Sequence, residues 1–232
     1  MSYKPVTHVL FDMDGLILNT EDFYMIGYQE VASRFNKNFT FELKCKIMGK
    51  QTHELASSVI NELNLPLSVD EFIVETRKIF DKLFLQSKVM PGVEKLLRHL
   101  HKHKIPMGLA TSSSEETYNL KVKNHHDIFE LFTYKTWGSS DPDVKRGKPY
   151  PDIFFVAAAK FPDKPSPDKC LVFEDSINGV KAAVAAGMQV IMVPDPRLNR
   201  KLASEATLIL SSMEDFRPEV FGLPAFDDIK SE

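Results

Sequence analysis

The sequence predicts an α/β fold, a Rossmann-like doubly wound parallel sheet with a small inserted α-helical cap domain. Short apolar runs rich in β-formers recur along the chain and alternate with amphipathic helical patterns, which is typical of a parallel sheet covered on both faces. One long block breaks this alternation, because residues 21 to about 86 carry successive helical patterns with no strand between them. The first observation predicts the sheet, and the second predicts the cap.

Five short segments of the chain have the composition of buried strands. They are residues 6–11, 105–111, 132–137, 169–174 and 189–193. Two amphipathic segments, 92–103 and 176–187, are expected as crossover helices, and Gly187 stands where the second helix is expected to stop. The order of strands and helices therefore predicts the connections of a parallel sheet.

The helical block is expected to form a second, smaller domain. Inside it, Ser68 and Glu71 form a capping box ahead of an amphipathic helix. The predicted division is a core domain of residues 1–16 and 88–232 and a cap domain of residues 17–87, with hinges near residues 16–20 and 87–91. Because the block follows the first strand, we expect it to lie over the carboxyl edge of the sheet.

Composition limits the classes of function. The 232 residues are 43% hydrophobic and 26% charged, with a net charge of −3, so no basic field favours nucleic acid or a membrane surface as a partner. The two cysteines, Cys45 and Cys170, form no CxxC motif, which favours a reducing compartment and argues against a structural zinc. The weakly polar run 182–194 is too short to span a bilayer. We therefore expect a cytoplasmic protein, a monomer or a weak homodimer.

Polar side chains follow four of the predicted strands at the point where each strand ends. In chain order they are Asp12 and Asp14, Thr111 with residues 112–114, Lys148, and Glu174 with Asp175. Each set alone is typical of a turn or a helix cap. Because the carboxyl ends of parallel strands meet at one edge of a sheet, all four sets together predict a single crevice with four carboxylates, one ammonium and several hydroxyls.

Four carboxylates in one crevice need a cation. Two unit charges about 4 Å apart repel by roughly 4 kcal/mol even at an effective dielectric constant of 20. An all-oxygen ligand set beside a ligand phosphate favours Mg²⁺. The sequence therefore predicts Mg²⁺ bound by Asp12, the backbone carbonyl of Asp14 and Asp175, with Glu174 either as a ligand or directly behind the ligands, and with Lys148 supplying further positive charge.

These motifs resemble those of the haloacid dehalogenase superfamily of phosphohydrolases, and the helical block resembles the small cap of that superfamily. The resemblance spans essentially the whole chain. It is nearest to the pseudouridine-5'-phosphatase group, to which the following stretches are similar: VTHVLFDMDGLILNTE, ATSSS, GKPYPDIF, CLVFEDSINGV and FGLPAF. An aspartate two residues after Asp12 favours a phosphatase or a phosphomutase over a dehalogenase.

The resemblance implies a reaction and a role for each residue. Asp12 is expected to attack phosphorus and form an aspartyl phosphate, and Asp14 to act first as the acid and then as the base. The phosphoryl oxygens are expected to be bound by Thr111, Ser112 and the backbone N–H groups of Asp14 and Gly15, and their charge to be stabilised by Mg²⁺ and Lys148.

The expected function is Mg²⁺-dependent hydrolysis of a small phosphomonoester, a sugar or nucleoside monophosphate, in nucleotide metabolism. Pseudouridine 5'-phosphate is the most specific expectation. Two alternatives stay open at this point: a β-phosphoglucomutase-like phosphosugar isomerase, and a catalytically silent binding protein on the same fold.

Weaker signals concern the cap. The turn at residues 48–52 makes Lys50 a candidate for binding substrate, as are Thr20, Glu21 and Tyr24 near the first hinge. Relatives commonly have an acid where this chain has Asn19, at the same hinge. Outside the cap, two histidines have the spacing of metal ligands, but no third ligand is evident, so a basic helix end is the better interpretation: His99 and His103.

Overall fold

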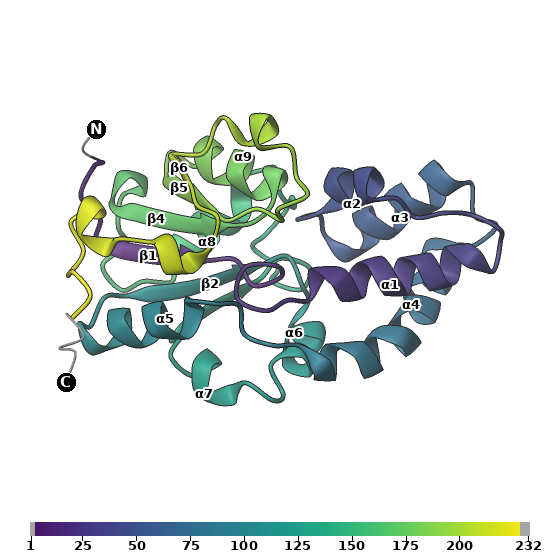
Figure 1. The fold of residues 1–232 in the computed structure, drawn as a ribbon, viewed down its shortest axis with the longest axis horizontal. Coiled ribbons are helices and arrows are strands. Elements are labelled where there is room, and N and C mark those ends of the chain that lie inside the picture. The colour runs from purple at the N-terminus through teal and green to yellow at the C-terminus, as the bar shows by residue number, and fades with distance from the viewer. Residues whose placement is uncertain (1–2, 228–232) are drawn as a thin grey trace.

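A six-stranded parallel sheet forms the centre of the α/β unit, at the left of Figure 1. The structure is a computed structural model and describes residues 3–227. The strand order is β3-β2-β1-β4-β5-β6. The bounds are β1 His8–Phe11, β2 Met107–Thr111, β3 Tyr134–Trp137, β4 Cys170–Glu174, β5 Gln189–Met192 and β6 Leu208–Ile209. The first five lie inside the predicted segments, whereas β6 was not predicted because two residues carry no readable pattern.

Helices cover both faces of the sheet, as expected for parallel strands. Successive side chains of β1 point to opposite faces, so Val9 and Phe11 pack in the core that includes α5, and Leu10 packs in the core that includes α8 and α9. The helices of this unit are α5 Val93–Lys102, α6 Glu115–Lys121, α7 His126–Phe129, α8 Asp152–Ala159 and α9 Ile177–Ala185. Short 3₁₀ helices complete it: η2 Pro167–Lys169, η3 Arg200–Ala203, η4 Met213–Asp215 and η5 Pro218–Phe221.

The helical unit lies beside the sheet, at the right of Figure 1. It contains α1 Glu21–Ser33, α2 Phe41–Ile47, α3 Thr52–Leu63, α4 Val69–Leu83 and the 3₁₀ helix η1 Phe84–Gln86. Its hydrophobic core is separate from those of the sheet and includes Tyr28, Phe72 and Phe80. The predicted capping box is present at the start of α4, where Ser68 Oγ accepts from the N–H of Glu71 at 3.2 Å. This unit therefore has a core of its own.

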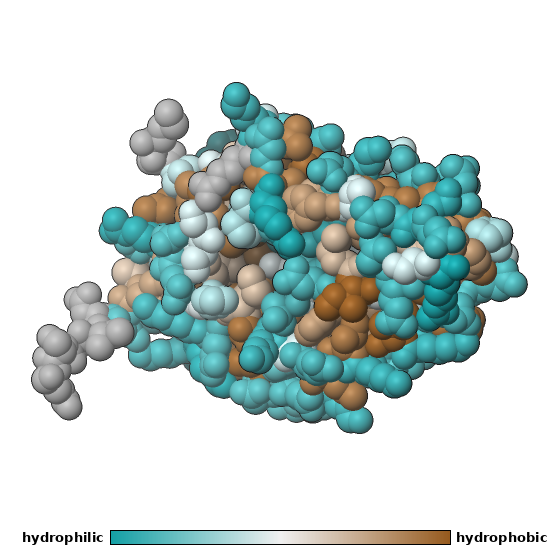
Figure 2. Space-filling model, turned by 45° about the vertical axis from the view of Figure 1, so that its right-hand side comes forward, coloured by the Kyte–Doolittle hydropathy of each residue, from teal (hydrophilic) through white to brown (hydrophobic). Residues whose placement is uncertain are grey.

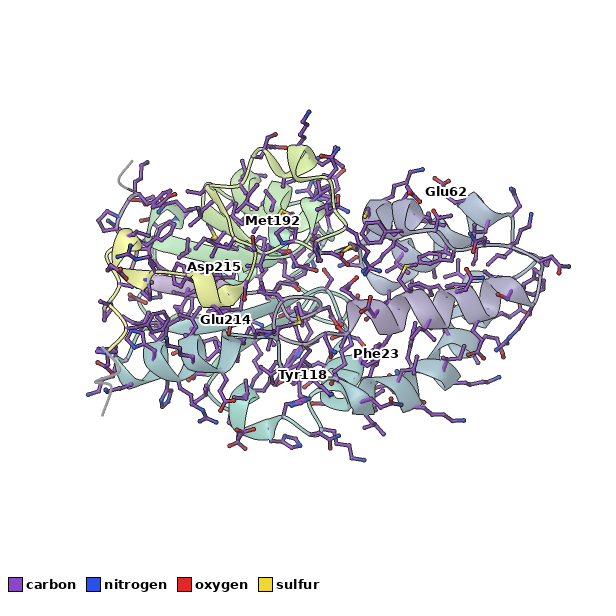
Figure 3. The ribbon with its side chains drawn as sticks, viewed as in Figure 1. Phe23, Glu62, Tyr118, Met192, Glu214 and Asp215 are labelled. Carbon is purple, nitrogen blue, oxygen red and sulfur yellow. The ribbon has the colours of Figure 1, made fainter. Side chains whose placement is uncertain are left out.

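Two chain segments connect the units. They lie against each other, since Leu18 and Val89 form an antiparallel bridge. Figure 3 shows Met192 inside the α/β unit and Glu62 on the outer side of the helical unit. The two connecting segments therefore run side by side where the units meet.

The face of the molecule drawn in Figure 2 is mainly polar. Figure 2 shows hydrophilic side chains over most of one face, with hydrophobic ones gathered on the part that comes forward from the helical unit. Among the exposed hydrophobic side chains of this unit are Ile26 on α1 and Val74 on α4. Within residues 3–227, the helices are too short or too polar to cross a membrane.

Candidate active site

Three buried carboxylates meet at the carboxyl end of the central strands. The strand order reverses between β1 and β4, the place where open α/β sheets bind ligands. Asp12 directly follows β1, Glu174 ends β4, and Asp175 follows it. Oxygen atoms of these three side chains lie within 4.8 Å of one another. The fold thus brings together residues that are more than 160 positions apart in the chain.

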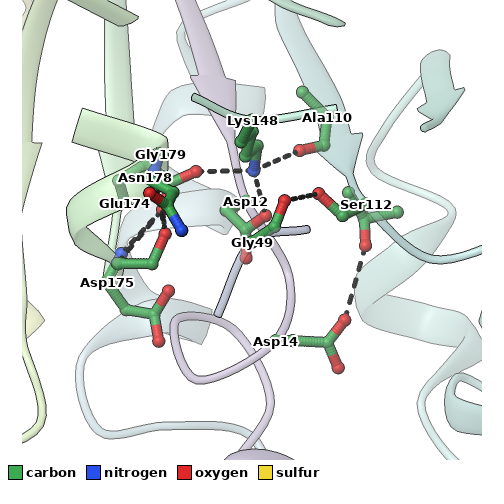
Figure 4. Close-up of polar contacts among 12 residues, drawn as sticks. Asp12, Asp14, Gly49, Ala110, Ser112, Lys148, Glu174, Asp175, Asn178 and Gly179 are labelled. Atoms are coloured by element: carbon green, nitrogen blue, oxygen red, sulfur yellow. Dashed lines mark hydrogen bonds and ion pairs between the residues drawn. The ribbon is translucent and has the colours of Figure 1, made fainter. Parts of the chain in front are cut away.

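Lys148 lies between two of these carboxylates. Its Nζ donates to Asp12 Oδ1 and Glu174 Oε1, both at 2.5 Å, and to the carbonyl of Ala110 at 3.2 Å (Figure 4). Burial alone lowers the pKa of Lys148, but the two carboxylates outweigh burial and hold it above its usual value. The lysine is therefore a fixed positive charge next to Asp12.

The N-terminus of α9 fixes Glu174. Its Oε2 accepts from the backbone N–H of Asp175 at 3.1 Å and from the N–H and Oγ of Ser176 at 3.2 and 3.1 Å. Gly179 is the residue of α9 that faces this carboxylate, and a Cβ there would lie 2.0 Å from Glu174 Oε1. The carboxylate is thus held between a helix terminus and Lys148.

The charge balance of this cluster fits a divalent cation. Three carboxylates and one ammonium leave two negative charges in a buried space. Burial raises the pKa of Asp12 to about 7 despite the opposing effect of Lys148. Burial, with the charges of Glu21, Asp12 and Glu174, raises the pKa of Asp175 far above its usual value. A hard cation bound to these oxygens would relieve both effects.

Asp14 has a different environment from Asp12. Its Oδ1 accepts from Thr20 Oγ1 and Lys121 Nζ, both at 2.5 Å, and its Oδ2 accepts from Ser113 Oγ at 3.1 Å and Thr111 Oγ1 at 3.4 Å. Figure 4 shows this carboxylate on the side away from Glu174 and Asp175. Burial raises the pKa of Asp14, but Lys121 and the hydrogen bonds outweigh it, so the pKa lies below its usual value.

A pocket of about 310 Å³ opens beside these carboxylates, at the low end of the size range of small-molecule sites. One end is polar, and its wall includes Asp12, Asp14, Asp175, Ser112, Ser113 and Lys50. The other end lies in the helical unit, and its wall includes Tyr24, Tyr28, Phe72, Phe80 and Phe84. Both units therefore contribute to one site, which suits a ligand with an anionic group and an apolar part.

The profile of a protein family described as haloacid dehalogenase-like hydrolase matches residues 9–193. The chain belongs to this family. A Drosophila melanogaster relative named "Probable pseudouridine-5'-phosphatase" is 49% identical over 225 residues, covering 97% of each chain. "(DL)-glycerol-3-phosphatase 2" of Arabidopsis thaliana is 45% identical over 226 residues, covering 96% of this chain and 94% of the relative. A β-phosphoglucomutase structure from Clostridium difficile has the same fold, with a TM-score of 0.77, 22% identity and coverage of 92% and 94%.

These findings confirm the predicted family, its likeness to the pseudouridine-5'-phosphatase group, the fold class and the reaction class. The chain is a hydrolase of phosphoric monoesters, and its substrate is a small phosphorylated molecule. The role of each residue in this hydrolase, its metal and its specific substrate stay proposals.

Only some of the residues expected to bind substrate lie in the wall of the pocket. Ser112 and Lys50 line the pocket, although Lys50 Nζ is held by Glu54 at 3.0 Å and by Ser58 at 3.1 Å. Thr111 is fully buried behind Asp14 and is not part of the pocket wall found within residues 3–227. Ser113, two residues further on, reaches the wall instead.

Gly15 lies in the turn that follows β1. Its N–H, expected to bind the phosphoryl group, donates to the carbonyl of Leu18 at 2.8 Å and closes the turn after β1. Gly15 is needed for space, because a Cβ at its φ of +79° would lie 2.1 Å from Asp175 Oδ2. Close approach to Asp175 explains why a glycine stands at this position, and its N–H group is paired within the turn in this structure.

The predicted turn at residues 48–52 of the helical unit rests on the α/β unit. The carbonyl of Gly49 accepts from Ser112 Oγ at 2.7 Å, and Gln51 Nε2 donates to the carbonyl of Gly138 at 2.5 Å. Asn178 Nδ2 adds a bond of 2.8 Å to the carbonyl of Met48. The helical unit therefore covers the pocket in this structure.

Lys121 was missed by sequence reasoning. It ends α6, its side chain is fully buried, and its partner Asp14 is 107 residues away. One signal was available, because Lys121 lies three residues after buried Tyr118 and directly before buried Val122, on the inward face of α6. The position was not predicted to be buried because lysines rarely are.

The histidine pair has an acidic neighbour that the sequence did not indicate. The structure brings Asp227 within 4.8 Å of His99 and His103, so a third candidate ligand exists. However, Asp227 Oδ2 accepts from Lys102 at 2.6 Å, and His99 Nε2 lies 2.9 Å from the carbonyl of Pro224. These contacts attach the segment that contains Pro224 and Asp227 to α5, which explains why the three side chains lie together.

Proposed function

We propose that this hydrolase cleaves its substrate through an aspartyl phosphate on Asp12. The observation that supports this most strongly is the position of Asp12, at the switch point of the sheet, with a carboxylate oxygen 2.5 Å from the buried cation of Lys148. A carboxylate fixed in this way is a nucleophile whose surroundings stabilise negative charge on a phosphoryl group. Asp14, two residues further along on the same side of the chain, is proposed as the proton carrier.

The proposed reaction has two steps. In the first, Asp14 has taken up a proton in the complex with substrate. An oxygen of Asp12 then forms a bond to phosphorus, the bond between phosphorus and the leaving oxygen breaks, and the proton of Asp14 passes to the leaving alkoxide. In the second, water attacks the same phosphorus and gives a proton to Asp14, while the bond between phosphorus and Asp12 breaks. Inorganic phosphate leaves, and both carboxyl groups return to their starting states.

The proposed cofactor is Mg²⁺, which members of this family generally use. Asp12, Asp175 and the backbone carbonyl of Asp14 would hold it, with Glu174 as a ligand or directly behind them. Bound there, it would neutralise the phosphoryl oxygens. The three clustered carboxylates support this proposal, because oxygen donors with two uncompensated negative charges suit a hard divalent ion.

The proposed substrate class is nucleoside monophosphates, with pseudouridine 5'-phosphate as the specific candidate. The name of the Drosophila relative supports it. The pocket supports it too, because an aromatic-lined end such as that formed by Tyr24, Tyr28 and Phe80 gains more from a flat base than from a glycerol chain. Residues 17–87 are proposed as the cap that encloses the leaving group and excludes water.

A phosphate-release assay tests these proposals. Purified protein is given pseudouridine 5'-phosphate, uridine 5'-monophosphate, glycerol 3-phosphate and sugar phosphates, with Mg²⁺ or with a chelator. We expect the highest kcat/KM for a nucleoside monophosphate and no turnover with the chelator. Isomerised sugar phosphate without free phosphate would instead indicate a mutase, and binding without turnover of any compound would indicate a silent protein.

Two variants test the assigned residues. Asp12→Asn is expected to abolish turnover while still binding substrate, because the amide keeps the shape but is not a nucleophile. Asp14→Asn is expected to lower kcat by about 10² to 10⁴-fold, the usual contribution of a positioned acid or base. Radiolabelled phosphate that remains acid-stable on the wild-type protein but is absent from Asp12→Asn would identify the intermediate. Wild-type rates in either variant would refute the assignment.

A further inference from the structure

Lys121 is a buried lysine in direct contact with the proposed proton carrier. Its Nζ donates to Asp14 Oδ1 at 2.5 Å, to the hydroxyl of Tyr24 at 2.7 Å and to Ser113 Oγ at 2.8 Å. All three hydrogens of the ammonium group are therefore used. Within the described part of the chain, the pocket wall includes Asp14 but not Lys121, so the lysine lies behind the carboxylate rather than beside a ligand.

A stabilising role for the fold is a weak explanation of this arrangement. Removing a lysine and an aspartate from water costs about as much as their attraction returns, and buried ion pairs are often replaced by apolar residues without loss of stability. The pair is also placed where it affects chemistry, because Asp14 takes all its side-chain bonds from Lys121 and three hydroxyl groups, those of Thr20, Thr111 and Ser113. These donors contact both oxygens, so the direction of the carboxylate is fixed in this structure.

Lys121 also connects Asp14 with the helical unit. Its Nζ lies 4.9 Å from the ring centroid of Tyr24 and 4.8 Å from that of Phe84. Tyr24 belongs to α1 and Phe84 begins η1, so the two rings come from the first and last helices of the helical unit. The same ammonium group therefore contacts the proton carrier and both ends of the proposed cap.

We propose that Lys121 is a positioning residue for Asp14. Lys121 sets the direction of the Asp14 carboxylate and links that direction to the cap through Tyr24 and Phe84. It acts on both proton transfers, to the leaving oxygen and from the attacking water, and has no contact with the substrate. The inference rests on the proposed acid and base role of Asp14. It assigns the lysine a function that no motif of the sequence indicates.

The two steps of the reaction provide the test, because they depend on Asp14 to different extents. The p-nitrophenolate ion leaves without protonation, so attack on p-nitrophenyl phosphate needs no acid, whereas hydrolysis of the aspartyl phosphate still needs the base. In Lys121→Met, we expect the first turnover with this substrate to slow by less than about threefold and the later turnovers by about 10²-fold. A burst of about one equivalent of p-nitrophenolate per active site then precedes a slow steady state.

Alkyl phosphates behave differently under this proposal. With glycerol 3-phosphate or a nucleoside monophosphate, both steps need Asp14, so kcat of Lys121→Met is expected to fall by about 10²-fold with KM within about threefold of wild type. The control is Lys160→Met. Lys160 is also held by a carboxylate, Asp141 at 2.6 Å, and lies over the ring of Trp137, but it is not in the pocket wall; wild-type kinetics are expected.

The results separate this inference from the proposed function. If Asp14→Asn has wild-type kinetics, the proposed function fails. If Asp14→Asn is slow but Lys121→Met is not, only the proposed role of Lys121 fails. That role also fails if Lys121→Met turns over aryl and alkyl phosphates equally slowly and shows no burst. Support requires that Lys121→Met/Asp14→Asn is no slower than Asp14→Asn alone. If circular dichroism shows Lys121→Met unfolded, Lys121→Gln is judged by the same criteria.

Discussion

Asn19 and Lys88 pair the two segments that connect the helical unit to the sheet. The N–H of Asn19 donates to the carbonyl of Lys88 at 3.1 Å, and the N–H of Lys88 donates to Asn19 Oδ1 at 2.7 Å. Asn19 is the position where an acid was expected from the resemblance. Its side-chain oxygen makes the bond that a carboxylate would make, so the substitution preserves the connection without adding a charge.

This pairing predicts the effect of changing Asn19. Asn19→Ala removes the acceptor for the N–H of Lys88 and is expected to lower the free energy of unfolding by about 1 kcal/mol, as for a typical hydrogen bond. Asn19→Asp keeps an acceptor and is expected to remain close to wild type. Urea denaturation measures both. Equal stability of Asn19→Ala and wild type would show that the bond contributes nothing to the connection.

Lys148 is expected to be essential for both stability and turnover. Lys148→Met leaves Asp12 and Glu174 buried without a cation, a change that typically costs about 3–5 kcal/mol. We expect a strongly lowered unfolding midpoint in the metal-free protein, partial recovery with Mg²⁺, and no detectable phosphate release. The matched control is Lys102→Met, whose exposed pair with Asp227 is expected to matter little. Wild-type activity in Lys148→Met would contradict the proposed site.

Two glycines have the same backbone conformation but different surroundings, so alanine at each distinguishes the cost of backbone strain from the cost of a steric clash. Gly15 has φ +79° and Gly187 has φ +77°. A Cβ at Gly15 would overlap Asp175 Oδ2, whereas at Gly187 the only contact among residues 3–227 is the Pro167 Cβ at 3.6 Å. Gly187→Ala is expected to cost only the backbone strain, about 1–2 kcal/mol, and to keep its activity. Gly15→Ala is expected to lose stability and also Mg²⁺ affinity, measured by calorimetry, because Asp175 must move.

The raised pKa values of Asp12 and Asp175 predict how stability changes with pH. The folded, metal-free protein keeps protons on these groups at pH values where the unfolded chain has released them. For Asp12, stability therefore falls as pH rises from about 4 to about 7. Mg²⁺ binds the deprotonated oxygens, so it is expected to raise the melting temperature more near pH 8 than near pH 5. An equal Mg²⁺ effect at the two pH values, measured by thermal denaturation, would contradict a metal site at these carboxylates.

Much of the fold could be predicted because the information was local. The apolar, β-forming composition of 6–11 and the helical spacing in 92–103 depend only on neighbouring residues, and both segments contain the expected element. Strands β1 to β4 begin one or two residues later than predicted, and β5 ends one residue earlier. The strand β6 had no local pattern, so its pairing with β5 depends on the tertiary fold.

Within the candidate site, the sequence by itself determined which residue types stand at the ends of the strands. Asp12, Lys148 and Asp175 could be grouped in advance because parallel strands end at one edge. Only the tertiary structure decided the contacts across that edge: the N–H of Gly15 is used in a turn, Thr111 lies behind Asp14, and Lys121 reaches Asp14 from α6. The physical reason is that secondary structure follows from interactions between neighbours, whereas the partners of a buried charge are set by how separate elements pack.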